Sequence, residues 1–294
     1  MATLLKGTLF APELVSDLFN KVTGHSSIAR LAAQIPVAFN GNEIFTFNFD
    51  KEVDIVAENG QKTEGGISVA PKSIIPLKVE YGARVTDEFM YASEEKQLDI
   101  LRAFNEGYAK KVARGLDIMV MHGLNPRTNT RATQTIGDKS FDTDQLVNRI
   151  TYTAADPEAN LEDAIAALGE YEATGFAFSK TFAAALAALK VNGVSQYPEF
   201  KLGANPGTLG GRACDVNSTV SVAATGETPD QAILGDFANA FKWGYAKQIP
   251  LEIIPYGDPD QSGEDLKAHN QVYLRAETYI GWAILVPEAF AVIA

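Results

Sequence analysis

The chain has 294 residues, 46% of them hydrophobic and 21% charged, a composition typical of a folded globular protein. Its 37 acidic and 25 basic residues give a net charge of −12. Because tight binding of nucleic acid depends on Lys and Arg contacts to phosphate, this charge argues against a protein whose main function is to bind nucleic acid tightly. It does not argue against a protein that only encloses nucleic acid. No apolar run reaches the ~18 residues of a membrane span. The N-terminus also lacks a signal-peptide core and cleavage site, so we expect use in a cytoplasm.

The first 35 or so residues are predicted to be helical and then extended. Apolar residues at helical spacing follow Pro12, whose fixed φ suits the start of a helix. These residues are Leu14, Val15, Leu18 and Phe19. A second short element is expected to begin near residues 26–31, SSIARL.

The next segment predicts a long two-stranded ribbon. Residues 43–49, EIFTFNF, alternate strictly, and the polar, glycine-rich tip lies within 53–68, VDIVAENGQKTEGGIS. A return strand is predicted to begin at Ile74, so that the ribbon covers 43–85. Such a ribbon is marginally stable alone, and its free edges invite pairing with another chain. Two interpretations stay open: it lies on a neighbouring copy, or it folds as an ordinary hairpin onto its own sheet.

Residues 93–122 predict the clearest helix of the chain. Apolar residues recur at steps of three and four, Ser93 is a suitable N-cap, and Gly123 is a natural stop. About 30 residues at 1.5 Å each give a helix of roughly 45 Å. That length is long for a helix of a globular domain and indicates a helix that serves as a rigid structural support.

Residues 150–255 alternate between helical and strand patterns, which predicts an α/β or α+β unit. A helix is expected over 160–171 with Asn160 as its N-cap, and KTFAAALAALK predicts another. The expected strands are FAFS, GGRACDV, STVSVAA, QAILGDF and IPLEIIPY. The last run, NQVYLRAETYIGWAIL, is expected to pair elsewhere, beside the long helix.

Catalytic signatures are absent from the sequence. It has no P-loop, GxGxxG, GxSxG or HExxH motif. Its three histidines, His25, His122 and His269, are far apart, and no carboxylate pair stands out, so neither a metal site nor a cofactor is predicted. The single cysteine, Cys214, excludes an intramolecular disulfide and a CxxC metal site. We expect it to be a small buried apolar residue, with a nucleophile as the alternative.

Five segments carry a resemblance to a known family. They are HSSIARLA, VDIVAENGQKTEGGISVAPKSIIPLKV, VTDEFMYAS, ARGLDIMVMHG and HNQVYLRAETYIGWAILVPEAFAVI. In their order the chain resembles the major capsid protein of tailed double-stranded-DNA bacteriophages, whose fold is shared with encapsulins. The resemblance implies an α+β phage major-capsid fold. Its expected parts are an N-terminal arm (1–42), an extended β-hairpin loop (43–85), a peripheral domain (86–149) with spine helix 93–122, an α/β axial domain (150–255) and a return to the peripheral domain (256–294).

The resemblance also implies a function. Copies of the chain would form pentamers and hexamers that close into an icosahedral shell around phage double-stranded DNA, without sequence-specific binding, enzymatic activity, a membrane or a cofactor. The implied location is the virion capsid, assembled in the cytoplasm of the host bacterium. A portal protein, a scaffolding protein or protease, and a decoration protein are the implied partners. The alternatives are an encapsulin-like shell with a protein cargo, and a soluble enzyme using Cys214 or a carboxylate pair.

Some family members crosslink their shells, and the resemblance suggests matching residues here. Lys62 lies at the loop tip, and Asn270 and Glu277 are separated by seven positions. In the implied reaction the neutral lysine amine attacks the asparagine amide, a desolvated glutamate with a raised pKa takes the proton, and ammonia leaves. The alternative is an exposed loop charge and two residues that end and brace a strand. Gly65-Gly66 beside the lysine is a departure from the family pattern. The two glycines loosen the tip, whereas the reaction needs its groups to be positioned tightly.

Overall fold

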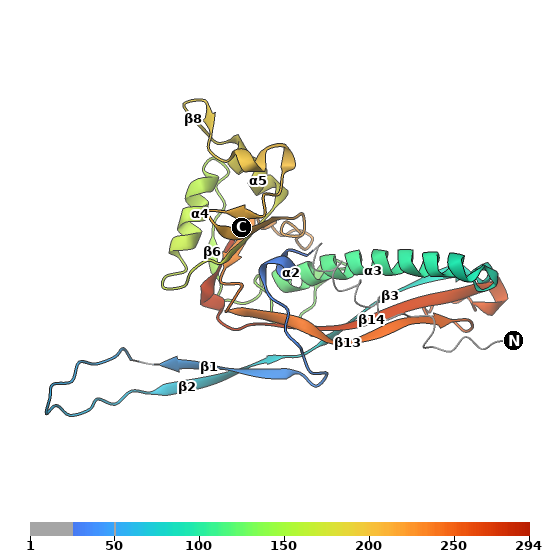
Figure 1. The fold of residues 1–294 in the computed structure, drawn as a ribbon, viewed down its shortest axis with the longest axis horizontal. Helices are drawn as coiled ribbons and strands as arrows, with labels where there is room; N and C mark the ends of the chain where they lie inside the picture. The colour runs from blue at the N-terminus through green and yellow to red at the C-terminus, as the bar shows by residue number, and fades with distance from the viewer. Residues whose placement is uncertain (1–25, 50) are drawn as a thin grey trace.

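The computed structural model describes residues 26–49 and 51–294. In this part of the chain a long helix lies along a three-stranded sheet, a lobe built on a second sheet lies beside them, and a ribbon points away from both (Figure 1). The architecture is mixed α/β, in agreement with the predicted fold class. The helix expected over 12–19 lies outside the described residues.

The long helix forms as its periodicity predicts. Helix α3 spans Glu94–His122 and ends at Gly123, which adopts a left-handed φ of 64° and donates its backbone N–H to Met119. Ser93 occupies the N-cap position, but its side chain makes no capping hydrogen bond. Apolar residues on one face of the helix enter the main core together with the sheet below: Leu101, Tyr108, Val112, Leu116 and Val120.

The sheet under α3 is antiparallel, with the order β13-β14-β3. Its strands are β3 (Leu77–Thr86), β13 (Phe241–Ile254) and β14 (Gln271–Ile284). The Tyr108 hydroxyl on α3 lies 2.7 Å from the Thr278 hydroxyl on β14, so one hydrogen bond joins helix and sheet inside the core.

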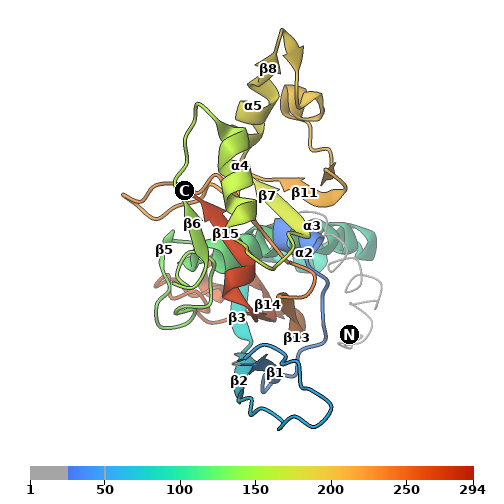
Figure 2. The ribbon, with the colours of Figure 1, turned by 90° about the vertical axis from the view of Figure 1, so that its left-hand side faces the viewer.

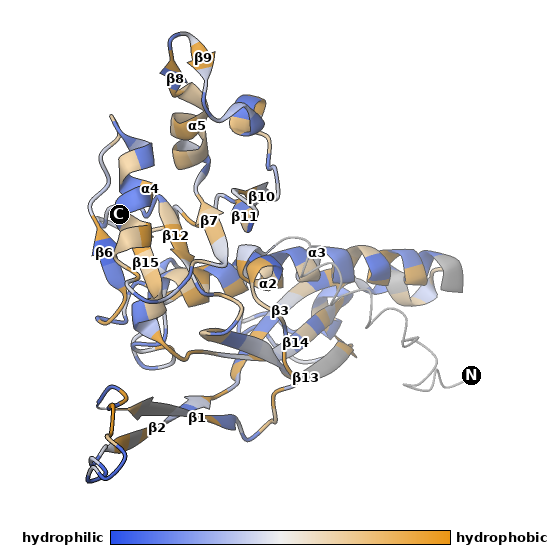
Figure 3. Cartoon of the chain, turned by 60° about the vertical axis from the view of Figure 1, so that its left-hand side comes forward, coloured by the Kyte–Doolittle hydropathy of each residue, from blue (hydrophilic) through white to orange (hydrophobic). Residues whose placement is uncertain are grey.

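The lobe is built on a six-stranded sheet of order β10-β11-β7-β12-β15-β6, with α4 and α5 beside it (Figure 2). Strands β7, β12 and β15 carry the apolar colouring in Figure 3, and all their residues are buried. Central strands that are covered on both faces of a sheet have continuous apolar sequences, because neither face is exposed to water. The lobe's elements are β6 (Asn148–Ile150), α4 (Pro157–Ala166), β7 (Gly175–Phe178), α5 (Lys180–Ala188), β10 (Thr208–Leu209), β11 (Arg212–Val216), β12 (Ala232–Gly235) and β15 (Phe290–Ile293).

The ribbon consists of β1 (Asn42–Phe49) and β2 (Ile67–Ile74), paired antiparallel with Phe49 opposite Ile67. The return strand therefore begins at Ile67, and the expected start at Ile74 is wrong. The run from Leu77 onward forms β3 instead, because Pro76 has no N–H for a ladder and separates the two strands. The remaining elements are α2 (Ser27–Leu31), β4 (Leu124–Asn125), β5 (Thr130–Arg131), β8 (Lys190–Val191), β9 (Val194–Ser195) and the 3-10 helices η1 (Asp87–Tyr91), η2 (Pro198–Gly203), η3 (Lys267–His269) and η4 (Pro287–Ala289).

Two local predictions in the lobe are wrong. Helix α4 begins at Pro157, and Asp156 is its N-cap, accepting a hydrogen bond from the Ala159 N–H. Asn160 lies inside the helix, where its side-chain amide bonds both backbone groups of Thr153. The segment 218–224, STVSVAA, is not a strand but a turn over 218–221 followed by irregular chain.

The division of the strands between the two sheets also differs from the predicted ranges. Strand β13, expected within the 150–255 unit, pairs with β14 under α3. Strand β15, within the expected return segment 256–294, pairs with β12 and β6 in the lobe. The short helix η4, which begins at Pro287, separates β14 from β15 and lets the chain cross from one sheet to the other.

Candidate functional site

The ribbon presents apolar side chains to solvent along its whole length. Val53 is 96% exposed and Ile55 is 97% exposed. The other exposed apolar residues of the ribbon are Phe45, Phe49, Val56, Ile67 and Val69. Strands β1 and β2 pair only with each other among the described strands. Contiguous exposed apolar side chains mark an interaction surface, because exposing them to water is unfavourable.

The base of the ribbon is fixed to the body. Ile74 at the end of β2 is buried in a small cluster with Val37 and Ala283. The backbone N–H of Ile35, in the chain leading to β1, donates to the Trp243 carbonyl over 2.9 Å. The ribbon therefore leaves the body from an anchored base, whereas its strands pair with no other strand of the described residues.

A buried carboxylate holds the segment that precedes the ribbon. Asp117 on α3 is fully buried and accepts hydrogen bonds from the backbone N–H groups of Ser27 and Ile28. It also accepts hydrogen bonds from the hydroxyls of Ser26 and Thr219. Burial raises the pKa of Asp117 to about 6, although these hydrogen bonds favour the charged form and lower it.

A second carboxylate holds the same segment from the lobe. Asp215 on β11 accepts hydrogen bonds from the Ser27 hydroxyl and the Asn205 amide. It also forms an ion pair with Arg30 at 2.7 Å. Helix α2 is thus tied both to α3 and to the lobe, which fixes the point where residues 26–31 meet the body.

The three residues suggested for a crosslink lie apart. Lys62 is exposed in the ribbon tip. Asn270 is exposed at the end of η3, with a left-handed φ of 53°. Glu277 is 6% exposed, and its carboxylate forms ion pairs with Lys78 at 2.7 Å and Arg275 at 3.5 Å. The hydrogen bond with Glu277 raises the pKa of Lys78.

Strand geometry keeps these residues from meeting within one chain. Seven positions along β14 separate Asn270 from Glu277 by roughly 20 Å. Asn270 accepts a hydrogen bond from the backbone of Asp87, at the far end of β3 from the ribbon. The 8 residues of β2 and 10 of β3 lie between that point and the tip, a length of roughly 60 Å of extended chain.

Sequence reasoning missed Asp117 as an anchor. The available signal was a carboxylate on the apolar face of a helix, between Leu116 and Ile118, because such a charge is rarely buried without partners. Cys214 is buried in β11, as expected. Burial raises the pKa of its thiol to about 12, which disfavours the thiolate that a nucleophile needs.

Comparison with known proteins gives the family. The model of the phage capsid family matches residues 6–294. The chain belongs to the phage capsid family. A comparison with curated proteins gives no match. Among the helices of the described residues, none has the length and apolar character needed to cross a membrane.

Solved structures resemble this capsid protein over most of its length. One from Mycobacterium phage Ogopogo is 28% identical, with a TM-score of 0.77, and the match covers 92% of this chain and 91% of that one. One from Gordonia phage Cozz is 26% identical, with a TM-score of 0.73, covering 92% and 86%. The capsid of a native GTA particle, 14% identical, has a TM-score of 0.61 and covers 100% and 93%, which shows the shared fold.

The family fixes the protein's general role. It is a structural major capsid protein, a subunit that associates with its own copies, as pentamers and hexamers, to form the icosahedral shell of a virion. The expected function is confirmed at this level. The alternative of a soluble enzyme does not agree with the family.

Proposed function

We propose that the ribbon, β1 and β2 with the tip 51–66, lies across a neighbouring copy in the shell. The exposed apolar side chains carry this proposal, above all Val53 and Ile55, which their own chain leaves almost wholly in water. Obligate interfaces bury about 2,000–5,000 Å² and are more apolar than other protein surfaces. A projecting ribbon extends the area that one small subunit can share with its neighbours.

The other parts take roles consistent with this arrangement. The sheet β13-β14-β3 with α3 is the peripheral domain. The role expected for the N-terminal arm, 1–42, is contact with neighbouring copies, although its residues 1–25 lie outside the described part of the chain. The six-stranded lobe is the axial domain, whose tip meets its equivalents around five-fold and local six-fold axes. Exposed apolar residues at the outer end of the lobe support that contact: Val191, Val194 and Leu202.

The shell encloses phage double-stranded DNA and assembles in the cytoplasm of a host bacterium, with a portal protein and a scaffolding protein or protease as partners. A decoration protein is a further candidate partner. The net charge of −12 supports confinement over tight binding, because a shell whose subunits are not strongly basic does not hold the phosphates of the genome tightly.

Nuclease treatment of particles from infected cells tests the proposed content. We expect double-stranded DNA that is protected until the particles are disrupted with denaturant, and none in shells of the expressed chain alone. A protein cargo in place of protected DNA would instead favour the encapsulin-like alternative.

A crosslink between Lys62 and Asn270 is a narrower proposal about the same shell. Since Lys62, Asn270 and Glu277 lie far apart in one subunit, the reaction would take them from different copies. The exposure of Lys62 and Asn270 supports contact between copies. The ion pair between Glu277 and Lys78 would have to open before Glu277 could accept a proton.

Denaturing electrophoresis of boiled mature particles tests the crosslink. A crosslinked shell gives a ladder of bands above the 31.7 kDa chain. Lys62→Ala should remove the ladder, while Lys72→Ala, on β2 outside the tip, should keep it. One band at the mass of the single chain would exclude the crosslink.

A further inference from the structure

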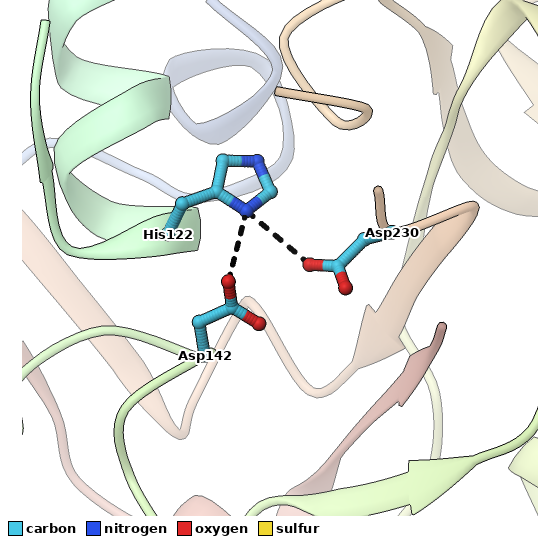
Figure 4. A group of neighbouring side chains, drawn as sticks. All are labelled: His122, Asp142 and Asp230. Atoms are coloured by element: carbon cyan, nitrogen blue, oxygen red, sulfur yellow. Dashed lines mark hydrogen bonds and ion pairs between the residues drawn. The ribbon is translucent and has the colours of Figure 1, made fainter. Parts of the chain in front are cut away.

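Three side chains from separate parts of the chain converge in the interior. His122 is the last residue of α3, Asp142 lies in the segment that follows, and Asp230 precedes β12 (Figure 4). His122 and Asp230 are buried, and Asp142 is mostly so. Each offers one ligand atom, and these atoms all lie within 4.8 Å of one another.

A hydrogen bond at Nε2, the ring nitrogen that faces away from the two carboxylates, orients the imidazole of His122. Nε2 lies 2.9 Å from the Thr219 carbonyl oxygen. A carbonyl only accepts, so Nε2 carries a hydrogen and donates it. In the neutral ring this leaves the lone pair on Nδ1, which points at the two carboxylates (Figure 4). A histidine that donates its second N–H to a backbone carbonyl is the usual arrangement of a metal ligand.

The two distances from the imidazole match those between ligands on one metal ion. Nδ1 of His122 lies 3.3 Å from Oδ2 of Asp142 and 3.3 Å from Oδ2 of Asp230. A charge-assisted N–H···O bond is shorter, about 2.7–2.9 Å. In a tetrahedral zinc site with bonds of about 2.0–2.1 Å, neighbouring ligand atoms are about 3.3–3.4 Å apart.

Asp230 supplies an independent observation. Its Oδ2 is buried and has no hydrogen-bond partner among the described residues, although it points into the cluster. A buried carboxylate oxygen without a donor is costly, and a bound cation removes that cost. Asp142 is held differently: Arg149 binds its Oδ1 at 3.0 Å and so leaves Oδ2 directed at the cluster. A second guanidinium, that of Arg131, also lies near this carboxylate, with its Nη1 3.6 Å from Oδ2.

The competing occupant is a proton. Burial lowers the pKa of His122, but the two neighbouring carboxylates, Asp142 and Asp230, raise it, to about 9 overall. A protonated ring would have to divide one N–H between two oxygens at 3.3 Å, and it would leave Oδ2 of Asp230 poorly paired. A divalent ion satisfies all three ligand atoms together and balances both carboxylate charges.

We propose that His122, Asp142 and Asp230 bind one first-row divalent metal ion of the zinc type, with the fourth position left for water. Imidazole and carboxylate ligands suit such an ion. The bound ion joins the end of α3, the segment after it and the entry to β12, so it ties the helix to the lobe. This role is structural and does not depend on how the ribbon acts in the shell.

Metal analysis of the full chain, purified without a metal-affinity tag, tests the proposal. We expect about one zinc ion per chain by mass spectrometry of the metal content. After removal of the ion with a chelator, added Co²⁺ should give the visible absorption of a tetrahedral site, and added Zn²⁺ should raise the melting temperature. Mg²⁺ and Ca²⁺ at the same concentration should not.

Asp230→Asn is the cleanest variant, because the one charged contact of Oδ2 is with Nδ1 of His122 at 3.3 Å, inside the cluster itself. We expect it to weaken zinc binding about a hundredfold or more, beyond the 10- to 100-fold typical of changes outside the ligands. Asp138→Asn, an exposed aspartate in the same segment, should bind as the unchanged chain does.

Several outcomes would overturn the proposal. They are an unchanged chain that takes up neither Zn²⁺ nor Co²⁺, equal zinc affinity in the two variants, and a preference for Mg²⁺ or Ca²⁺. If Asp230→Asn does not fold, the metal content and the Co²⁺ spectrum of the unchanged chain still decide between a metal and a proton.

Discussion

Removing the ribbon tip will leave a folded subunit that forms no shells. Phe49 and Ile67 are paired across the ribbon, so residues 51–66 can be replaced by one glycine, which leaves Asp50-Gly as a two-residue turn between the strands. The tip contributes little to its own subunit's core, because its apolar side chains Val53 and Ile55 are exposed. We therefore expect a stability within about 0.5 kcal/mol of the full chain. Circular dichroism melting measures the fold, and sedimentation with electron microscopy measures assembly.

Substitutions that keep the length of the tip separate its apolar contacts from its reach. Val53→Ser combined with Ile55→Ser should reduce the yield of shells strongly, because both side chains are expected to be buried in the assembled interface. Gln61→Ser, an exposed polar change in the same tip, is the matched control and should assemble normally. Normal shells from the shortened chain would refute the proposed role of the ribbon.

Asp117→Ala will destabilise the subunit by several kcal/mol, roughly 3–5, because it leaves buried donors without an acceptor. Two of these donors are the backbone N–H groups of Ser27 and Ile28, which cannot turn to water. Asp117→Asn should lower the free energy of unfolding by nearly the same amount. Both carboxylate oxygens accept from a backbone N–H, so the new amide NH₂ would face a donor on either side.

Denaturant unfolding of unassembled subunits measures these losses. Ser26→Ala is the graded control, because it removes one hydroxyl that donates to Asp117 and caps α2. That change should cost about 1 kcal/mol. An Asp117→Ala subunit within 1 kcal/mol of the unchanged chain would mean that the buried carboxylate does not hold the segment 26–31.

The elements best predicted from sequence are those whose pattern is local and long. The apolar steps of α3, ended by Gly123, identify the helix to within a residue, and the run from Gln271 identifies β14. The ribbon was expected from the alternation of 43–49 and the glycine-rich tip, but its return strand was placed too late. The alternating run after Pro76 is as good a strand as β2, and only pairing with β14 assigns it to the sheet.

The features that sequence could not give depend on contacts between distant segments. Strands β13 and β15 have ordinary strand patterns, and nothing local to them says which sheet each joins. The convergence of His122, Asp142 and Asp230 has no spacing motif, because three separate elements bring them together. The prediction of Asn160 as the N-cap is wrong for a local reason. Asp156 is the better N-cap residue, because it is followed by Pro157, whose fixed φ suits the first position of α4.

We propose that much of this chain's exposed apolar surface is covered only by copies of itself. Electron microscopy of the expressed, purified protein, with sedimentation of the same sample, tests it most directly. We expect closed, uniform particles with masses in the megadalton range, built from a 31.7 kDa chain. A compact monomer of 31.7 kDa at the concentrations of the experiment, with the ribbon protected from protease, would contradict it.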